Sequence, residues 1–139
     1  MDPHEARGRF AAERVARLAT VGPGGTPHLV PVVFAVEGDT IWIAVDDKPK
    51  RSRHLQRLAN IESDPRVSLL VDAYDDRDWS GLWWVRADGW GRVLRDSRSV
   101  ALSAELLAAK YPQHAERPPA GPAIQVEVER WTGWSATEG

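Results

Sequence analysis

The stretch LATVGPGGTPHLVPVVFAVEGDTIWIAVD, residues 18–46, decides the fold. Its apolar segments LATV, HLVPVVFAV and TIWIAVD are separated by the turn sequences GPGGTP and EGD. Short apolar runs separated by glycine- and proline-rich turns are typical of antiparallel strands joined by hairpins. We therefore predict a β-meander over this part of the chain, and in such a hairpin turn GPGG is not expected to bind phosphate.

Helices are expected on both sides of the meander. Asp2 is a suitable N-cap and Pro3 a suitable first helical residue, so a helix is expected from there to about residue 17. Residues from Lys50 to the sequence ESDP form a short basic helix with its leucines on one face. Asp96 caps a further helix, SRSVALSAELLAAKY, which is rich in good helix formers.

The remaining segments complete a barrel. Strands are expected at RVSLLVD (66–72), at LWWVRADGWGRVLR (82–95), whose two glycines indicate a bulge or close backbone approach, and at AIQVEVERW (123–131). In the last of these strands, apolar and polar residues alternate, so we expect it to be solvated on one face or to lie at a sheet edge. The preceding segment PQHAERPPAGP is expected to be a surface loop. Six strands, two longer helices and one short helix predict a mainly β, α+β domain over residues 1–139, an antiparallel barrel with helices at its ends.

Several predicted strands are apolar on both faces, among them VPVVFAV, SLLV and LWWV. A small barrel buries only one face of each strand, so the other face requires a partner. A second copy of the chain is the natural supplier, and we expect a homodimer.

Composition excludes several classes of function. The chain has no cysteine, and its four histidines show no ligand spacing, so neither thiol catalysis nor a metal site is expected. No apolar run approaches the roughly 20 residues of a membrane span, and the N-terminus lacks an apolar signal core, so a cytoplasmic protein is expected. No nucleophile elbow, Walker loop or acid–base pair stands out, so an enzyme of this sequence would rely on a cofactor.

The most unusual segment is DDKPKRSRHLQRL, residues 46–58, which carries five of the 18 basic residues of a chain with net charge −2. A solvated helix face, a clamp for an anionic small molecule and a nucleic-acid patch are the three interpretations. Nucleic acid is the weakest, because the whole chain is slightly acidic and no nucleic-acid-binding motif accompanies the patch. Lys48 and Lys50 follow a strand and Arg51 lies near a helix start, where backbone N–H groups add to the attraction for an anion.

The order of these features carries a family resemblance. RLATVGPGG to SLLVD (17–72), DWSGLWWVRADGWGRV (78–93) and, more loosely, VERWTGWSA (128–136) resemble the pyridoxamine 5′-phosphate oxidase-like split β-barrel family of flavin and deazaflavin enzymes. Within it, the chain is most similar to the actinobacterial branch of F420-dependent oxidoreductases. The resemblance implies a homodimeric, FMN-binding-like split barrel with two cofactor sites at the subunit interface.

By the same resemblance, basic residues between the third strand and the following helix hold the cofactor phosphate. Lys50 and Arg51 occupy these positions here, with Lys48 and Arg53 as outer candidates. The segments that pass along the cofactor ring correspond to Val32, Val33, Ala44 and Val45. Two aromatic positions also match: Trp79 near the ring, and Trp134 in the segment that the other subunit often supplies.

The resemblance implies an F420-dependent oxidoreductase that transfers a hydride between C5 of the reduced deazaflavin and a small-molecule acceptor. F420 carries several negative charges along its tail, which five basic residues suit better than the single phosphate of FMN. The alternatives are an FMN-dependent oxidoreductase, a non-catalytic F420-binding or carrier protein, and a nucleic-acid binder. The tail WTGWSATEG lacks the substrate motif of the vitamin B6 oxidases, and no catalytic residue is assigned, with Tyr74, His28 and Arg86 as candidate proton donors.

Overall fold

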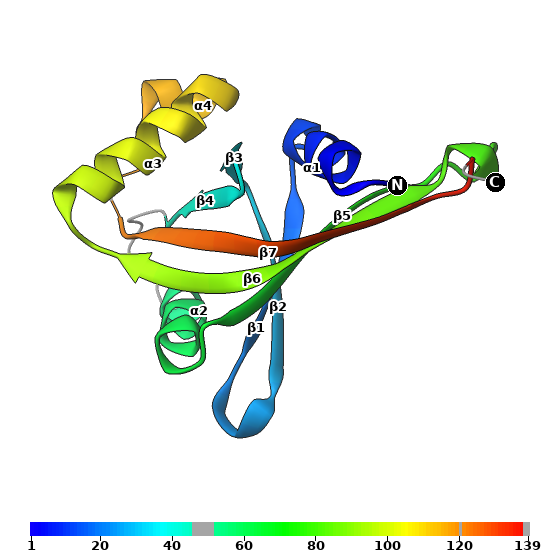
Figure 1. Cartoon of the computed structure of the whole chain (residues 1–139). Coiled ribbons are helices and arrows are strands. Elements are labelled where there is room, and N and C mark those ends of the chain that lie inside the picture. The colour runs from blue at the N-terminus through cyan, green and yellow to red at the C-terminus, as the bar shows by residue number, and fades with distance from the viewer. Residues whose placement is uncertain (46–51, 120, 138–139) are drawn as a thin grey trace.

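Two strands that are consecutive in the chain lie at opposite edges of one sheet. The computed structural model describes residues 1–45, 52–119 and 121–137, and in residues 52–55 the helix without its side chains. Its sheet has seven strands within these ranges, in the order β2-β1-β5-β6-β7-β4-β3, and all neighbours are antiparallel. Only Val33 and Phe34 separate the edge strand β2 from the edge strand β3, so the sheet must curl into a split barrel (Figure 1).

The bounds of the elements follow the chain. The strands are β1 (Ala16–Val21), β2 (Pro27–Val32), β3 (Ala35–Glu37), β4 (Thr40–Ala44), β5 (Arg66–Ala73), β6 (Trp83–Leu94) and β7 (Ala123–Ser135). The helices are α1 (Pro3–Ala12), α2 (Ser52–Ser63), α3 (Ser97–Lys110) and α4 (Pro112–Glu116), with single 3-10 turns η1 (Pro23–Gly25) and η2 (Trp79–Gly81). In Figure 1, α3 and α4 stand over one end of β6 and β7, and the chain termini lie near the other end.

The predicted helix N-caps Asp2 and Asp96 are confirmed. The Asp2 carboxylate accepts a hydrogen bond from the Glu5 N–H at 2.8 Å, and that of Asp96 accepts one from the Ser99 N–H at 3.0 Å. The expected helix to residue 17 is wrong, because α1 ends at Ala12 and the backbone of Glu13 is already extended. Beyond it, alternate residues of β1 face the barrel interior, a two-residue period that a helix would not satisfy.

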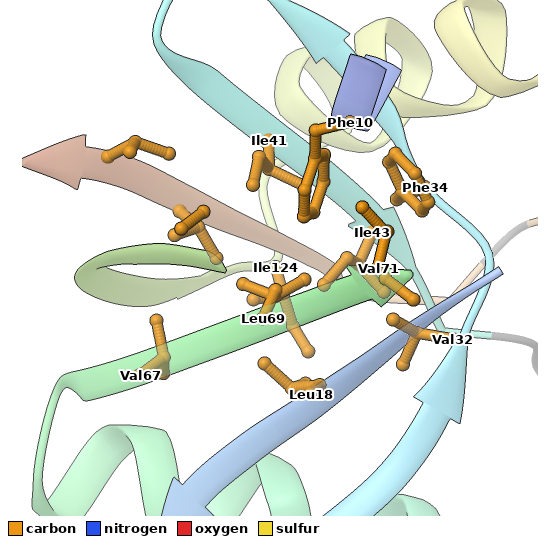
Figure 2. Close-up of a cluster of buried hydrophobic side chains, with 14 of the residues drawn as sticks. Phe10, Leu18, Val32, Phe34, Ile41, Ile43, Val67, Leu69, Val71 and Ile124 are labelled. Atoms are coloured by element: carbon orange, nitrogen blue, oxygen red, sulfur yellow. The ribbon is translucent and has the colours of Figure 1, made fainter. Parts of the chain in front are cut away.

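The interior of the barrel is closed by aromatic side chains. Phe10 from α1 packs against Phe34 with ring centroids 4.9 Å apart and against Trp131 at 5.3 Å. Below them, Figure 2 shows aliphatic side chains from several strands pointing into one cluster, including Leu18, Leu69 and Ile124, each fully buried. The main apolar core of the described residues thus lies inside the curled sheet, and α1 covers it.

Four other expectations are corrected, wholly or in part. The segment HLVPVVFAV is not one strand, because the Phe34 N–H donates to the Tyr111 hydroxyl at 3.2 Å instead of to a neighbouring strand. The segment PQHAERPPAGP is not only a loop, because its first five residues form α4. The basic helix is not short, since α2 has 12 residues. The charged face of the final strand is solvated, as one of the two alternatives expected, because Glu127 and Glu129 are exposed. The other alternative is wrong, since β7 lies between β6 and β4 and not at an edge. The strand also extends to Ser135, which adds Trp134 to it.

Candidate functional site

A cavity of about 240 Å³ lies where the ends of β2 and β4 meet α2 and α4. We call it the α2–α4 cavity; it is lined by Pro31, Val32, Val33, Ile43, Ala44, Arg57, His114, Arg117 and Pro119. The strands supply its apolar floor, and the helices supply its basic side chains. The structure therefore brings together three residues expected at the cofactor, Val32, Val33 and Ala44.

Pairing in the sheet explains why these strand ends converge. β2 continues into β3, β3 pairs with β4, and β4 pairs with β7 so that Ala44 lies opposite Ala123. Val33, between two strands, packs beside the small cluster of Ala35, Leu107 and Tyr111. Val45, also expected at the cofactor, is 3% exposed and belongs to the main core; it does not line the cavity.

Arg57 brings a positive charge to this apolar floor. It lies on α2, is only 9% exposed, and burial lowers the pKa of its guanidinium from the ordinary value. An arginine nevertheless stays protonated at neutral pH, so the charge persists in a largely buried position. Polar contacts fix α2 against the barrel, since the Asn60 side-chain amide donates to Thr20 Oγ1 at 3.0 Å.

His114 and Arg117 line the opposite wall and were not among the expected site residues. Both come from α4 and the residue that follows it, the segment expected to be a loop. Pro112 at the first position of α4 is a helix-start signal, but the other prolines of the segment outweighed it. Sequence alone does not indicate that this helix turns back onto β2 and β4.

The remaining predicted basic residues cannot be placed in the cavity. Lys48, Lys50 and Arg51 lie outside the described residues, and Arg53 lies on α2 with its side chain outside the description. Their assignment to the cofactor phosphate therefore stays a prediction. In the sequence, these residues lie between Ala44, which ends β4 and lines the cavity, and Arg57 on α2.

Trp79 and Trp134 lie away from the α2–α4 cavity within one chain. Trp79, in η2, is 65% exposed and Trp134, near the end of β7, is 47% exposed. Figure 1 places their segments at the end of β6 and β7 remote from α3 and α4. Neither residue can contact the same cavity of the same chain, so a cofactor-binding role for them requires another subunit.

A larger apolar hollow of about 590 Å³ lies on the outer face of the sheet. We call it the outer hollow; its apolar lining includes Leu29, Leu70, Tyr74, Trp83, Trp84 and Trp134. Several of these side chains are strongly exposed, and Leu29 reaches 66%. Large exposed apolar patches mark interaction surfaces or ligand-binding grooves.

None of the three candidate proton donors lines the α2–α4 cavity. Tyr74 and Arg86 line the outer hollow, where the Tyr74 hydroxyl donates to Asp76 at 2.9 Å and Arg86 Nε donates to Asp88 at 3.0 Å. His28 lies on β2. The described residues contain no cluster of three or more histidines and carboxylates suited to a metal, and no helix among them is long and apolar enough to cross a membrane.

Comparison with known proteins identifies a family and solved structures that are similar to this chain. The family model described as pyridoxamine 5′-phosphate oxidase matches residues 2–135. A curated 5a,11a-dehydrotetracycline/5a,11a-dehydrooxytetracycline reductase of Streptomyces rimosus subsp. rimosus is 37% identical over 68 residues, which are 48% of this chain. The match spans only 46% of that relative.

Two solved structures share the fold over nearly the whole chain. A conserved hypothetical protein of Mycobacterium tuberculosis superposes with a TM-score of 0.79 at 23% identity, covering 98% of this chain and 86% of the other. An FAD-binding protein of Mesorhizobium loti gives a TM-score of 0.73 at 21% identity, covering 96% and 94% of the two chains. At such identities the likeness concerns the split-barrel fold.

Proposed function

Because the chain belongs to the pyridoxamine 5′-phosphate oxidase family, an oxidoreductase-like family, we propose that it is an F420-dependent reductase with a small-molecule acceptor. One observation carries the proposal: the α2–α4 cavity joins the apolar strand residues expected at the cofactor to the buried cation Arg57. A cofactor that combines a flat ring system with an anionic side chain suits such a mixed site. The reductase name of the Streptomyces rimosus relative favours reduction as the direction of the reaction.

The residues of the cavity fit such a cofactor. Val32, Val33 and Ala44 offer an apolar surface without ionisable groups, and the basic side chains lie on the helices across the cavity. The ring nitrogen Nδ1 of His114 is buried and has no hydrogen-bond partner within the described part of the chain. A buried polar atom without a partner costs free energy, which a hydrogen-bonding ligand in this cavity would recover.

When bound, reduced F420 supplies a hydride from C5 of its ring, and the protein supplies position and exclusion of water. The strand residues hold the ring side through van der Waals contacts, and the helix cations hold the anionic side. Lys50 and Arg51 are proposed as the phosphate clamp, with Lys48, Arg53 and Arg57 as neighbours for the longer anionic tail of F420. No acid–base residue is assigned.

We further propose that a second copy of the chain covers the outer hollow. The exposed tryptophans Trp79 and Trp134 would then reach the cofactor site of the partner, which they cannot do within their own chain. The same contact would remove Leu29 and Leu70 from water, at a gain of about 25 cal/mol for each Å² of apolar surface.

FMN is the second candidate cofactor. FMN carries a single phosphate group, for which two basic residues suffice, and the fold is shared with an FAD-binding protein. A non-catalytic F420 carrier would bind F420 with the same residues, and it would differ from a reductase only in the absence of turnover.

Titration with F420 and with FMN, followed by tryptophan fluorescence, tests the proposal. Binding of F420 at micromolar concentration with weaker FMN binding is expected, and the reverse order would replace F420 by FMN. Lys50→Ala with Arg51→Ala should weaken F420 binding by about 2–4 kcal/mol, whereas the exposed Arg98→Ala on α3 should not. Oxidation of F420H2 by quinones, unsaturated lactones or tetrapyrroles would then separate a reductase from a carrier.

A further inference from the structure

Lys110 carries an amine that the proposed function does not use. It is the last residue of α3 and lines neither the α2–α4 cavity nor the outer hollow. Its Nζ atom is shielded from solvent, although the residue as a whole is partly exposed. Because lysine normally keeps its charged end in water, the shielded amine of Lys110 is an unusual group in this fold.

The surroundings of Lys110 Nζ are aromatic. The atom lies 3.7 Å from the centroid of the Phe34 ring, which Figure 2 shows beside Phe10, and 5.2 Å from the centroid of the Tyr111 ring. The π faces attract a cation, but Nζ has no hydrogen-bond acceptor among the described residues. An ammonium group has three N–H donors, and all of them lose their water here. The geometry therefore favours the neutral amine.

The charged groups next to Lys110 act in opposite directions. The Arg14 guanidinium lies over the Tyr111 ring, 4.6 Å from its centroid, and Arg14 Nη2 donates to the Lys110 carbonyl at 3.1 Å. Burial, followed by the positive charge of Arg14, lowers the pKa of Lys110 to about 8, whereas Glu13 opposes this shift. A large share of the Lys110 side chains is therefore an uncharged nucleophile near this pH.

A small apolar electrophile suits an amine in this position. Carbon dioxide has no net charge, so it enters aromatic surroundings without the desolvation cost of a charged reagent. Its product with an amine is a carbamate, which is negatively charged. The repulsion between Lys110 and Arg14 then becomes an attraction, and Glu13 repels the product.

We propose that Lys110 is a carboxylation site, at which the neutral amine adds carbon dioxide reversibly and Arg14 stabilises the carbamate. The Nζ lone pair attacks the carbon atom and forms an N–C bond, one C=O π bond becomes a carboxylate lone pair, and one N–H proton leaves to water. The step needs no oxidant or reductant. It is independent of which cofactor the chain binds.

Carbon-13 NMR with labelled bicarbonate at about pH 8 detects the carbamate. The chain has only three lysines, Lys48, Lys50 and Lys110, so few carbamate signals are expected. Lys48→Arg with Lys50→Arg should retain the Lys110 signal, and Lys110→Arg should lose it. The carbamate of the N-terminal amine remains in both as an internal control. A Lys110→Arg spectrum identical to that of wild type would overturn the proposal.

Two neutral variants of the neighbouring charges test the environment of Lys110. Glu13→Gln removes the repulsion of the carbamate and should raise its signal about twofold, whereas Arg14→Gln should lower it about twofold. Arg98→Gln is the control, because Arg98 is exposed near the other end of α3. Thermal unfolding verifies that each variant is folded. Signals that change in the same direction in the first two variants, or in neither, would contradict the role of these charges.

Unfolding separates the effect of the fold from the ordinary reactivity of lysine. In urea at the same pH, the pKa of Lys110 returns to its ordinary value of 10.5, so the amine is protonated and the Lys110 signal should disappear. A signal of equal intensity in the folded and the unfolded chain would show that the fold does not create the site.

Discussion

The hydroxyl group of Tyr111 is hydrogen-bonded to both backbone groups of Phe34. It accepts from the Phe34 N–H at 3.2 Å, and the carbonyl oxygens of Phe34 and Arg14, each 3.0 Å away, share its one proton. Phe34 lies where β2 ends and β3 has not begun, so its backbone groups have no ladder partner there. A side chain 77 residues away thus supplies the hydrogen bonds that allow the strand to leave one edge of the sheet and enter the other.

Tyr111→Phe removes these hydrogen bonds and little volume. We expect a loss of about 1–3 kcal/mol in the free energy of unfolding, because the buried Phe34 N–H is left without a partner. Urea denaturation measures this loss. Tyr74→Phe is the control, since Tyr74 is 65% exposed and donates only to Asp76. Equal stabilities of the two variants would contradict the role assigned to Tyr111.

The lowered pKa of Lys110 predicts that the stability of the fold depends on pH. Its ammonium lies 3.7 Å from the centroid of the Phe34 ring, and burial, followed by the nearby charge of Arg14, lowers the pKa of Lys110 from 10.5 to about 8, against an opposing effect of Glu13. The unfolded chain therefore binds more protons than the folded chain between these two pH values. The contribution of Lys110 to the free energy of unfolding must rise as the pH increases from about 8 towards 10.5.

Lys110→Met isolates this contribution. The free energy of unfolding of wild type minus that of the variant should increase between pH 7 and about pH 9.5, as measured by urea denaturation in steps of pH. The upper limit stays below the titration of Tyr111, whose pKa burial raises above 10.0. A difference that is flat or falls over this range would contradict the depressed pKa of Lys110.

At Gly89 the backbone of β6 lies close to that of β7. The register between these strands shifts between Asp88 and Gly89, and a Cβ atom at Gly89 would collide with the Glu127 carbonyl group. Gly89→Ala should therefore lower the free energy of unfolding by about 1–3 kcal/mol. Gly8→Ala in α1 should instead raise it by about 0.5–1 kcal/mol, because its Cβ meets no atom within 4 Å and alanine is the better helix former. Chemical denaturation of both variants gives the comparison, and a neutral Gly89→Ala would exclude the close approach.

Local features of the fold were predictable from sequence. The turn at Gly38, with φ +60°, and the caps Asp2 and Asp96 depend on residues within a few positions of each other. The bulge at Gly89 was also indicated, because a glycine within a strand commonly marks one. The break after Val32 was not predictable, since its cause is a hydroxyl group far along the chain.

Some residues of the candidate site were likewise predictable from the sequence, and others were not. Val32, Val33 and Ala44 were expected from the family resemblance, and the structure brings them together. His114 and Arg117 were missed because their contact with the cavity depends on how α4 folds back, which no local pattern encodes. The phosphate role of Lys50 and Arg51 stays a prediction, and so does the single-domain assignment of residues 1–139.

The outer hollow predicts the oligomeric state. Leu70, which lines the outer hollow, is 40% exposed and lies among apolar side chains that a monomer would leave in water. If a second copy covers this face, Leu70→Glu places a charge in an apolar contact and should convert the dimer to a monomer. Sedimentation velocity measures the change in mass. Val15→Glu is the control, because Val15 is equally exposed at 40% but does not line the hollow.

Cofactor binding should be lost together with the dimer. In the proposed dimer, Trp79 and Trp134 would reach the cofactor site of the partner subunit. The Leu70→Glu monomer should therefore bind F420 more weakly than wild type, although its own α2–α4 cavity is intact. A Leu70→Glu monomer with unchanged affinity would show that one chain forms the whole site. A wild-type protein that sediments as a monomer would exclude the second copy as the cover of the outer hollow.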